Sequence, residues 1–594
     1  MDSSNPVNKS QPQHTHQQSS KSSEKKLYNL NTDFSMWLRT NKEEIEAPLP
    51  GQITYGHIPS WLSGSLIRNG PGDIDAYGPG VCRHVFDAPG RLHKYQIHDG
   101  KVLYTSKFIQ SRAFKGNTAD KRLIFNEFGT FATRDPCQTI FSRVATMFSD
   151  SIETIFSDNA NIGIFPFGDE IYSLAETPFA HRINLDNLET LNTVNVHEEL
   201  GIVHHTSHPH TLDGIVYNIG QKLSLLKRPQ YIIAEMDCTD DGSGPEFKND
   251  RSRHPQSTIL SPWATAKIVA TVPSRWPLSM GYIHSFAVTA NYFILIEQPL
   301  SIFLPDVPLN LLRREPVASA LKFHSNKKTL FHVIRRNQQG FNRSSKSRQV
   351  FSVPSFFFFH TINGYETVDG DTNDISIVVD ICCYDDPSII NCMYVDALKN
   401  AHTNPDYAKM IRGRPKRFTM KLSEFGKSQR GASQVAQSKL IVDIGCETPK
   451  INYESFNGKP YNYFYAISSD VDANQPGMLI KVDVLKETFI TWMEPNAYPS
   501  EPIFVPSPDS KAEDDGLILS TLLYGGESVT GPSRATLLIL KAQTLEPMTK
   551  VDIYCETAIP KCLHGWFFPD LKTTSFSTSK QNGNDDLEVT KATN

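Results

Sequence analysis

Four histidines along this chain share a setting that could hold a metal ion. Each lies on or beside a short apolar run: His208 in "SHPHTLDG", His284 in "GYIHSFAVT", His360 in "FFFFHTINGYE" and His564 in "CLHGWFFP". An imidazole without a hydrogen-bonding partner is costly to bury among apolar residues. Four neutral imidazoles would fill four positions of an octahedron around a divalent iron and leave roughly two open, which is typical of a catalytic metal.

The spacing of these histidines is compatible with a single site but does not prove one. They are separated by 76, 76 and 204 residues, as expected for strands of different blades that meet on one axis. For each histidine taken alone, the alternative is a buried side chain that bonds a backbone carbonyl.

The elements that would position these side chains are short strands. Apolar or β-branched runs bounded by Gly, Pro, Asn or Asp are typical of strands, and they occur at 291–298, 374–383, 478–484, 516–523 and 535–542. A strand, a turn that carries a leucine and a second strand recur near Leu188, Leu485 and Leu545. Repeated hairpins favour a β-propeller, although any all-β protein could contain them. The segment 301–350 departs from this pattern, and its helical spacing and basic loop indicate insertions on one face.

The bulk composition excludes several classes of function. A net charge of -5 over 594 residues gives no strong attraction to nucleic acid. The GxGxxG pattern is absent, and the "GKS" at 426–428 lacks the glycine that a phosphate loop needs at 421, so no nucleotide cofactor is expected. No run of about 18 apolar residues could span a bilayer.

The two ends of the chain are polar. Residues 1–26 have no apolar segment of a secretory signal and are expected to form a disordered tail. Residues 572–594 are expected to form a second disordered tail, which leaves 27–571 as a single β-propeller domain. The nine cysteines are an odd number without a CxxC pair, which favours a reducing, cytosolic compartment.

Several motifs in chain order carry a resemblance to a known family. They include "GSLIRNGPG" (64–72), "NEFGT" (126–130), "DPCQTIFSR" (135–143), "HPHTLDGIVYNIG" (208–220), "INYESFNGKPYNYFYA" (451–466), "YPSEPIFVPSPDS" (498–510) and "LHGWF" (563–567). From about residue 27 to residue 568 the chain resembles the carotenoid cleavage oxygenases, in particular the animal branch that contains the carotene oxygenases and the retinal-pigment-epithelium retinoid isomerase.

The resemblance implies an all-β, seven-bladed β-propeller with helical and loop insertions that cap one face, and one Fe(2+) per chain on its axis. The ligands would be His208, His284, His360 and His564, and His210 would lie in the outer shell or at the surface. Three carboxylates would accept hydrogen bonds from ligands, pairing Glu176 with His284, Glu447 with His360 and Glu501 with His564. Such a carboxylate fixes the tautomer and the aim of the imidazole and raises its basicity.

The resemblance also points to a tunnel for a polyene. Phe128 and Tyr282 are expected to line it, together with the aromatic run at 356–359, although aromatic residues near an axis are often simply core. Ala175 stands where many relatives have threonine, which could change oxygen access. The stretch "FDAPGRLHKY" (86–95) also differs from relatives and is expected to reshape a surface loop.

A membrane-facing stripe is expected near the tunnel mouth. A helix over "CQTIFSRVATMFSD" would place apolar side chains on one face, namely Ile140, Phe141, Val144, Met147 and Phe148. The alternative is a helix that packs on the core. Cys137 matches a position of proposed acylation in the family. Because carotenoids reside in bilayers, we expect a cytoplasmic protein that associates peripherally with intracellular membranes.

These features predict a non-haem Fe(II) dioxygenase that adds both atoms of O2 across a carotenoid double bond and gives two aldehydes, apocarotenals or retinal. Its partners would be a carotenoid or retinoid, O2 and a membrane surface, without nucleic acid or a nucleotide cofactor. One alternative is a retinyl ester isomerohydrolase, or a combined isomerase-oxygenase, on the same iron scaffold. Another is a non-catalytic propeller that serves as an interaction module, which should have lost metal ligands.

Overall fold

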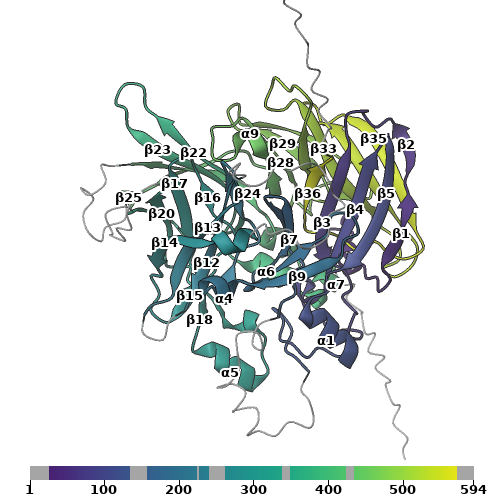
Figure 1. The fold of residues 1–594 in the computed structure, drawn as a ribbon, viewed down its shortest axis with the longest axis horizontal. Coiled ribbons are helices and arrows are strands. Elements are labelled where there is room, and N and C mark those ends of the chain that lie inside the picture. The colour runs from purple at the N-terminus through teal and green to yellow at the C-terminus, as the bar shows by residue number, and fades with distance from the viewer. Residues whose placement is uncertain are drawn as a thin grey trace, which may run out of the picture.

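The computed structural model of the chain describes residues 26–133, 157–223, 227–239, 261–336, 348–422 and 434–570. These residues form eight sheets, of which seven contain four to six strands and one contains three. The sheets stand side by side around a common centre (Figure 1). The prediction of an all-β chain is therefore confirmed. A seven-bladed propeller would need one larger sheet for each blade. The number of blades stays a prediction.

Four of the larger sheets are built from strands between residues 163 and 440. One contains β6 (Gly163–Phe167), β7 (Glu170–Leu174), β8 (Phe179–Ile183) and β9 (Thr190–Asn195). The next contains β10 (His204–His205), β11 (His210–Leu212), β12 (Ile215–Lys222), β13 (Gln230–Asp237) and β14 (Lys267–Pro273). The third contains β16 (Ala287–Val288), β17 (Tyr292–Glu297), β20 (Thr329–Arg335), β21 (Arg348–Val353) and β25 (Gln434–Val435). The fourth contains β22 (Phe357–Val368), β23 (Ile375–Tyr384), β24 (Arg414–Lys421) and β26 (Gln437–Leu440).

The other three larger sheets include the two that join the ends of the described chain. One contains β27 (Glu447–Lys450), β28 (Tyr463–Ile467), β29 (Leu479–Asp483) and β30 (Thr488–Trp492). The next contains β2 (Gln52–Gly56), β31 (Ala497–Pro499), β32 (Ile503–Pro506), β33 (Gly516–Tyr524), β34 (Ser533–Lys541) and β35 (Pro547–Cys555). The last contains β1 (Ile45–Pro50), β3 (Gly64–Pro71), β4 (Gly90–His98), β5 (Lys101–Phe108) and β36 (His564–Pro569).

The ring closes by exchange of strands between the two ends of the chain. The C-terminal strand β36 pairs antiparallel with β3, with Asn69 opposite His564, and the N-terminal strand β2 pairs with β35. Purple and yellow strands accordingly lie side by side in Figure 1. Closure leaves no open edge at the junction, which is the usual solution to the edge problem in radial β-folds.

The core lies between neighbouring sheets. Ile294 and Phe351 of one sheet pack with Phe358 and Phe418 of the next, and all four are buried. For this reason β17, "YFILIE", is buried at every position, whereas the outer strand β5 alternates between buried and exposed side chains. The repeated hairpins predicted near Leu188, Leu485 and Leu545 are the antiparallel pairs β8–β9, β29–β30 and β34–β35.

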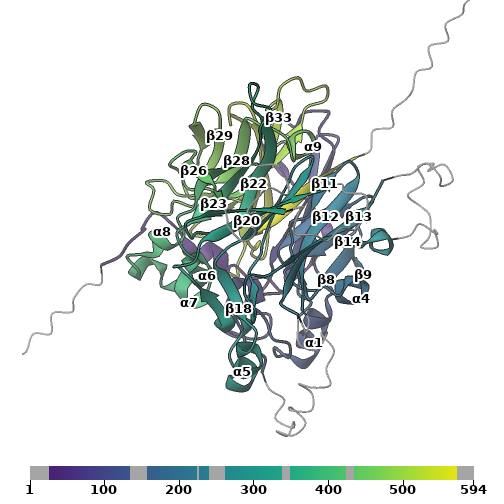
Figure 2. The same ribbon diagram turned by 90° about the vertical axis from the view of Figure 1, so that its left-hand side faces the viewer.

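Short helices and a small sheet supplement the larger sheets. The helices are α1 (Arg112–Asp120), α4 (Val196–Leu200), α5 (Asp306–Arg313), α6 (Ser388–Cys392), α7 (Val395–Lys399), α8 (Tyr407–Met410) and α9 (Tyr453–Phe456). The three-stranded sheet contains β15 (Ser279–Gly281), β18 (Leu300–Phe303) and β19 (Leu321–Phe323). Helices α1 and α5 lie toward the same side of the ring in both views (Figures 1 and 2).

One local expectation was wrong. The stretch "FDAPGRLHKY" is not a surface loop, because Asp87 is 1% exposed and Arg91 is fully buried. The Arg91 guanidinium donates hydrogen bonds to the Asn41 backbone carbonyl and the Ser106 hydroxyl. A buried guanidinium needs such acceptors, so this residue ties the N-terminal segment to the first sheet rather than shaping the surface.

Candidate metal centre

Each of the seven larger sheets supplies one side chain to the centre of the ring. The four histidines come from the β10–β11 connection, the residues just before β16, strand β22 and the start of β36: His208, His284, His360 and His564. The three carboxylates come from the β7–β8 connection, the start of β27 and the β31–β32 connection: Glu176, Glu447 and Glu501. The seven larger sheets converge here, which is why residues hundreds of positions apart can form one site.

The four histidines lie within reach of one metal ion. One nitrogen from each of them lies within 4.8 Å of the others. The Nε2 atom of His284 is 3.1 Å from Nε2 of His208 and 3.1 Å from Nε2 of His360. Burial lowers the pKa of His208 well below its ordinary value and that of His564 to about 4, so these imidazoles are neutral at pH 7.

The contacts of these rings fit a bound cation. His284 and His360 each use Nδ1 toward a carboxylate, Glu176 and Glu447 respectively. In a neutral imidazole whose Nδ1 carries the hydrogen, Nε2 carries only a lone pair. Two such lone pairs 3.1 Å apart repel each other unless a cation lies between them. The donor set therefore suits a divalent transition metal that accepts imidazole ligands.

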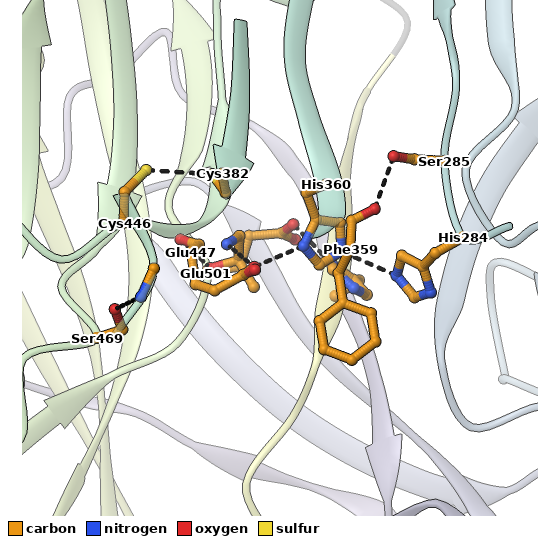
Figure 3. Close-up of polar contacts among 12 residues, drawn as sticks. His284, Ser285, Phe359, His360, Cys382, Cys446, Glu447, Ser469 and Glu501 are labelled. Carbon is orange, nitrogen blue, oxygen red and sulfur yellow. Dashed lines mark hydrogen bonds and ion pairs between the residues drawn. The ribbon is translucent and has the colours of Figure 1, made fainter. Parts of the chain in front are cut away.

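Figure 3 shows the carboxylates around His360. The Glu447 carboxylate accepts from Nδ1 of His360 at 2.5 Å, from the Tyr384 hydroxyl at 2.9 Å and from the Thr448 backbone N–H at 2.7 Å. Burial by itself would raise the pKa of the Glu447 carboxyl, but these donors outweigh it and hold that pKa below its ordinary value. The carboxylate is thus ionised and fixes the tautomer of His360.

Backbone strain contributes to this contact. Thr448 has a φ of 48°, a left-handed conformation that is an outlier for a β-branched residue. It turns the Thr448 N–H back onto the carboxylate of the preceding residue. Strain of this kind concentrates at functional sites, where the surrounding structure holds it in place.

The other two carboxylates have different partners. Glu176 contacts Nδ1 of His284 and accepts from the Tyr282 hydroxyl at 3.0 Å. Glu501 accepts from Nδ1 of His564 at 2.8 Å, from the Gly565 backbone N–H at 2.8 Å and lies 3.2 Å from Nζ of Lys450. Burial would raise the pKa of both carboxyls. The contacts with His284 and His204 instead lower the pKa of Glu176 to about 2, and those with Lys450 and His564 lower the pKa of Glu501 to about 2. All three predicted Glu–His pairs are therefore in contact.

Three further residues of this shell were not predicted from the sequence. Tyr384 ends β23, Lys450 ends β27, and His204 lies with Nε2 3.8 Å from Glu176. Lys450 stands three positions after Glu447 in "CETPKINY", so the motif contained it. Tyr384 follows the adjacent free cysteines Cys382 and Cys383 at the end of a mostly buried strand. Nothing in the local sequence links Tyr384 or Lys450 to its carboxylate partner, because those contacts depend on how the sheets are arranged.

The surroundings of the centre differ on its two sides. Aromatic and apolar residues pack next to His284 and form the aromatic cluster: Tyr282, Leu300, Phe357, Phe359, Tyr384 and Ile390, with Phe128 against it. The ring of Phe359 lies 4.9 Å from that of His284. A cavity of about 90 Å³ touches the other three histidines and is lined in part by Lys450, Tyr453 and Trp566.

The remaining predicted residues divide into three groups. His210 is no ligand here, since its Nε2 lies 2.9 Å from the Phe286 carbonyl. Ala175 is buried among aliphatic side chains that include Ile162 and Ile164. The predicted membrane stripe lies outside the described residues: Cys137, Ile140, Phe141, Val144, Met147 and Phe148. Among the helices of the described ranges, none is long and apolar enough to cross a bilayer.

Comparisons with known proteins show which family this chain resembles over most of its length. A profile of the family described as retinal pigment epithelial membrane protein matches residues 38–569. Carotenoid isomerooxygenase of Galleria mellonella is 42% identical over 547 residues, covering 92% of this chain and 98% of the relative. Human beta,beta-carotene 15,15'-dioxygenase is 32% identical over 568 residues, covering 91% and 95%. A solved structure of cobalt-substituted Synechocystis apocarotenoid oxygenase shares the fold, with a TM-score of 0.67 and 23% identity over 91% of this chain and all of that one.

Proposed function

We propose that this chain, which belongs to the retinal pigment epithelial membrane protein family of carotenoid cleavage oxygenases, is a non-haem Fe(II) dioxygenase that cleaves a carotenoid double bond. The observation that carries the proposal is the set of four converging histidines, three of them fixed by carboxylates. Relatives named carotenoid isomerooxygenase and beta,beta-carotene 15,15'-dioxygenase support the substrate class. A non-catalytic module has no need of this set.

One Fe(2+) would be held by the Nε2 atoms of His208, His284, His360 and His564. When bound, the iron would supply the binding and activation of O2, the chemistry that amino-acid side chains lack. In the reaction the C=C bond breaks, each carbon receives one atom of O2, and two aldehydes form without an external reductant. This balance agrees with the missing nucleotide motifs.

The side chains of this protein would orient the imidazoles, supply negative charge around the iron and exclude water from the substrate. Glu176, Glu447 and Glu501 keep three imidazoles in the Nδ1–H tautomer, so that each presents a lone pair to the centre. The aromatic cluster next to His284 supplies apolar walls for the polyene and excludes water. We assign the polyene to this side because its walls are apolar and aromatic, whereas the cavity that touches the other three histidines is lined in part by the charged groups of Lys450 and Glu501. Phe128 and Tyr282 would then contact the substrate.

Coupled isomerisation is a second candidate for the same centre. It is favoured by the two relatives named carotenoid isomerooxygenase, at 42% and 36% identity. A retinyl ester isomerohydrolase would use the same metal ligands, with iron acting on the ester rather than on O2. Peripheral attachment to intracellular membranes through residues 140–148 belongs to the proposal as well, because a carotenoid has to be taken from a bilayer.

The deciding experiment supplies the Fe(II)-loaded protein with β-carotene in detergent under ¹⁸O₂ and under argon. We expect two aldehydes that each carry one ¹⁸O, and a cis double bond in one product if isomerisation is coupled. His360→Ala protein is the matched control and should give neither product. Aldehydes formed equally under argon would refute an oxygenase, and cis-retinol released from a retinyl ester under argon, with carotenoids untouched, would establish the isomerohydrolase instead.

A further inference from the structure

Glu501 is buried, and it differs from the half-buried Glu176 and Glu447 in the charge of its partners. The Glu176 and Glu447 carboxylates accept hydrogen bonds from neutral tyrosine hydroxyls. Glu501 instead lies 3.2 Å from the ammonium group of Lys450. Within the described ranges, this is the one contact of 4 Å or less between a lysine or arginine side chain and any of these three carboxylates.

Lys450 is held in this position by its strand. It ends β27, the same strand that begins with Glu447, and its Nζ lies 5.7 Å from the centre of the Trp566 ring. Its side chain is 23% exposed and that of Glu501 is 2% exposed. The ion pair thus faces the 90 Å³ cavity, which also touches His208, His360 and His564.

The other charged groups near Glu501 do not take over this role. The buried guanidinium of Arg68 donates to the Glu501 backbone carbonyl at 3.0 Å, not to its carboxylate. His204 faces Glu176 rather than Glu501. Lys450 is therefore a positive charge placed directly on the carboxylate that fixes His564.

We propose that Lys450 is a positioning residue that raises the reduction potential of the iron and so keeps it ferrous in air. The proposal rests on the Fe(II) function proposed above. A fixed cation near a buried centre opposes any additional positive charge there, and the protein interior screens that effect less than bulk water does. It also withdraws charge from Glu501, which lowers the basicity of His564 and disfavours the ferric state.

The test compares Lys450→Gln, which removes the charge, with Lys450→Arg, which keeps it. Lys541→Gln is the matched control, because Lys541 forms an exposed ion pair with Glu546 at 3.0 Å. Each iron-loaded protein is titrated anaerobically with ferricyanide and dithionite in the presence of mediators, and the ferric fraction is read by electron paramagnetic resonance. In each oxidation Fe(II) gives one electron to ferricyanide, which becomes ferrocyanide.

At a fixed potential, we expect Lys450→Gln to shift the Fe(III):Fe(II) ratio at least about tenfold toward Fe(III), equal to about 59 mV for one electron. Lys450→Arg and Lys541→Gln should keep the wild-type ratio. Equal ratios for Lys450→Gln and wild type, or an Arg variant that shifts as far as the Gln variant, would overturn the inference. Wild-type protein that binds no iron would instead refute the proposed function. If Lys450→Gln loses its iron, Lys450→Met is subjected to the same titration.

Discussion

Replacing Glu447 by glutamine is expected to weaken metal binding while the fold stays intact. The substitution keeps the shape of the side chain and removes its charge. Its carbonyl oxygen can still accept from Nδ1 of His360 and from the Thr448 N–H, while its new amide group can donate to the Tyr384 hydroxyl, which rotates to accept. No buried polar group loses its partner, so a folded variant is expected.

The expected size follows from the hydrogen bond to His360. A bond to a charged group contributes about 1.5–3 kcal/mol and a neutral one about 0.5–1.5 kcal/mol. The variant should therefore lose about 1–2 kcal/mol of the interaction that aims the imidazole, which is about 5- to 30-fold in affinity. Loss of such an outer contact generally costs about 10- to 100-fold, and the two ranges overlap.

The assay is an anaerobic competition for Fe(II) between the protein and a chelator of known affinity, with carotenoid cleavage measured on the same preparations. Glu546→Gln serves as control, since Glu546 is an exposed carboxylate paired with Lys541. Its metal affinity should equal that of wild type. An unchanged Fe(II) affinity and unchanged turnover in Glu447→Gln would show that Glu447 is only a turn residue and that its contact with His360 does not affect metal binding.

Three further outcomes are expected. His360→Ala should bind less than about one tenth of the wild-type iron, because it removes a ligand, and full iron content by elemental analysis would contradict the ligand assignment. The metal-free protein should lose thermal stability as the pH falls from 6.5 to about 4. Burial lowers the pKa of His84 and His205 to about 4 in the folded chain, so the unfolded chain binds protons in this window that the folded chain does not. A melting temperature that stays constant over this window would contradict the neutral, buried state of these histidines. Replacing Phe141 and Phe148 by serine should reduce co-sedimentation with liposomes while iron stays bound, and normal sedimentation would assign the stripe to the core.

The sequence allowed the centre to be predicted because its residues lie in recognisable motifs. Short apolar runs contain all four histidines, and the resemblance to a family indicated that they bind one metal ion together: His208, His284, His360 and His564. Strands such as β17 and β23 were predictable because apolar and β-branched residues are concentrated there. The all-β class followed from the same local pattern.

Residues that act through neighbouring strands could not be predicted in this way. Tyr384 reaches Glu447 across a sheet boundary, and Lys450 reaches Glu501 from one sheet to the next. Arg91 illustrates the same limit, because the stretch "FDAPGRLHKY" that contains it was expected to form a surface loop. It is buried because the Asn41 carbonyl, 50 positions away, accepts its hydrogen bond. Local sequence carries no information on such partners.

The long final interval between the four histidines has a structural cause. His564 is the first residue of β36, the strand that pairs with β3 and closes the ring. The 204 residues that separate it from His360 contain the whole sheet that carries Glu447 and every strand except β2 of the sheet that carries Glu501. These strands therefore precede the last of the four histidines in the chain. His564 therefore reaches the other three histidines only when the ends of the chain have met. Because a metal binds the complete set more tightly than a partial one, metal binding and ring closure stabilise each other.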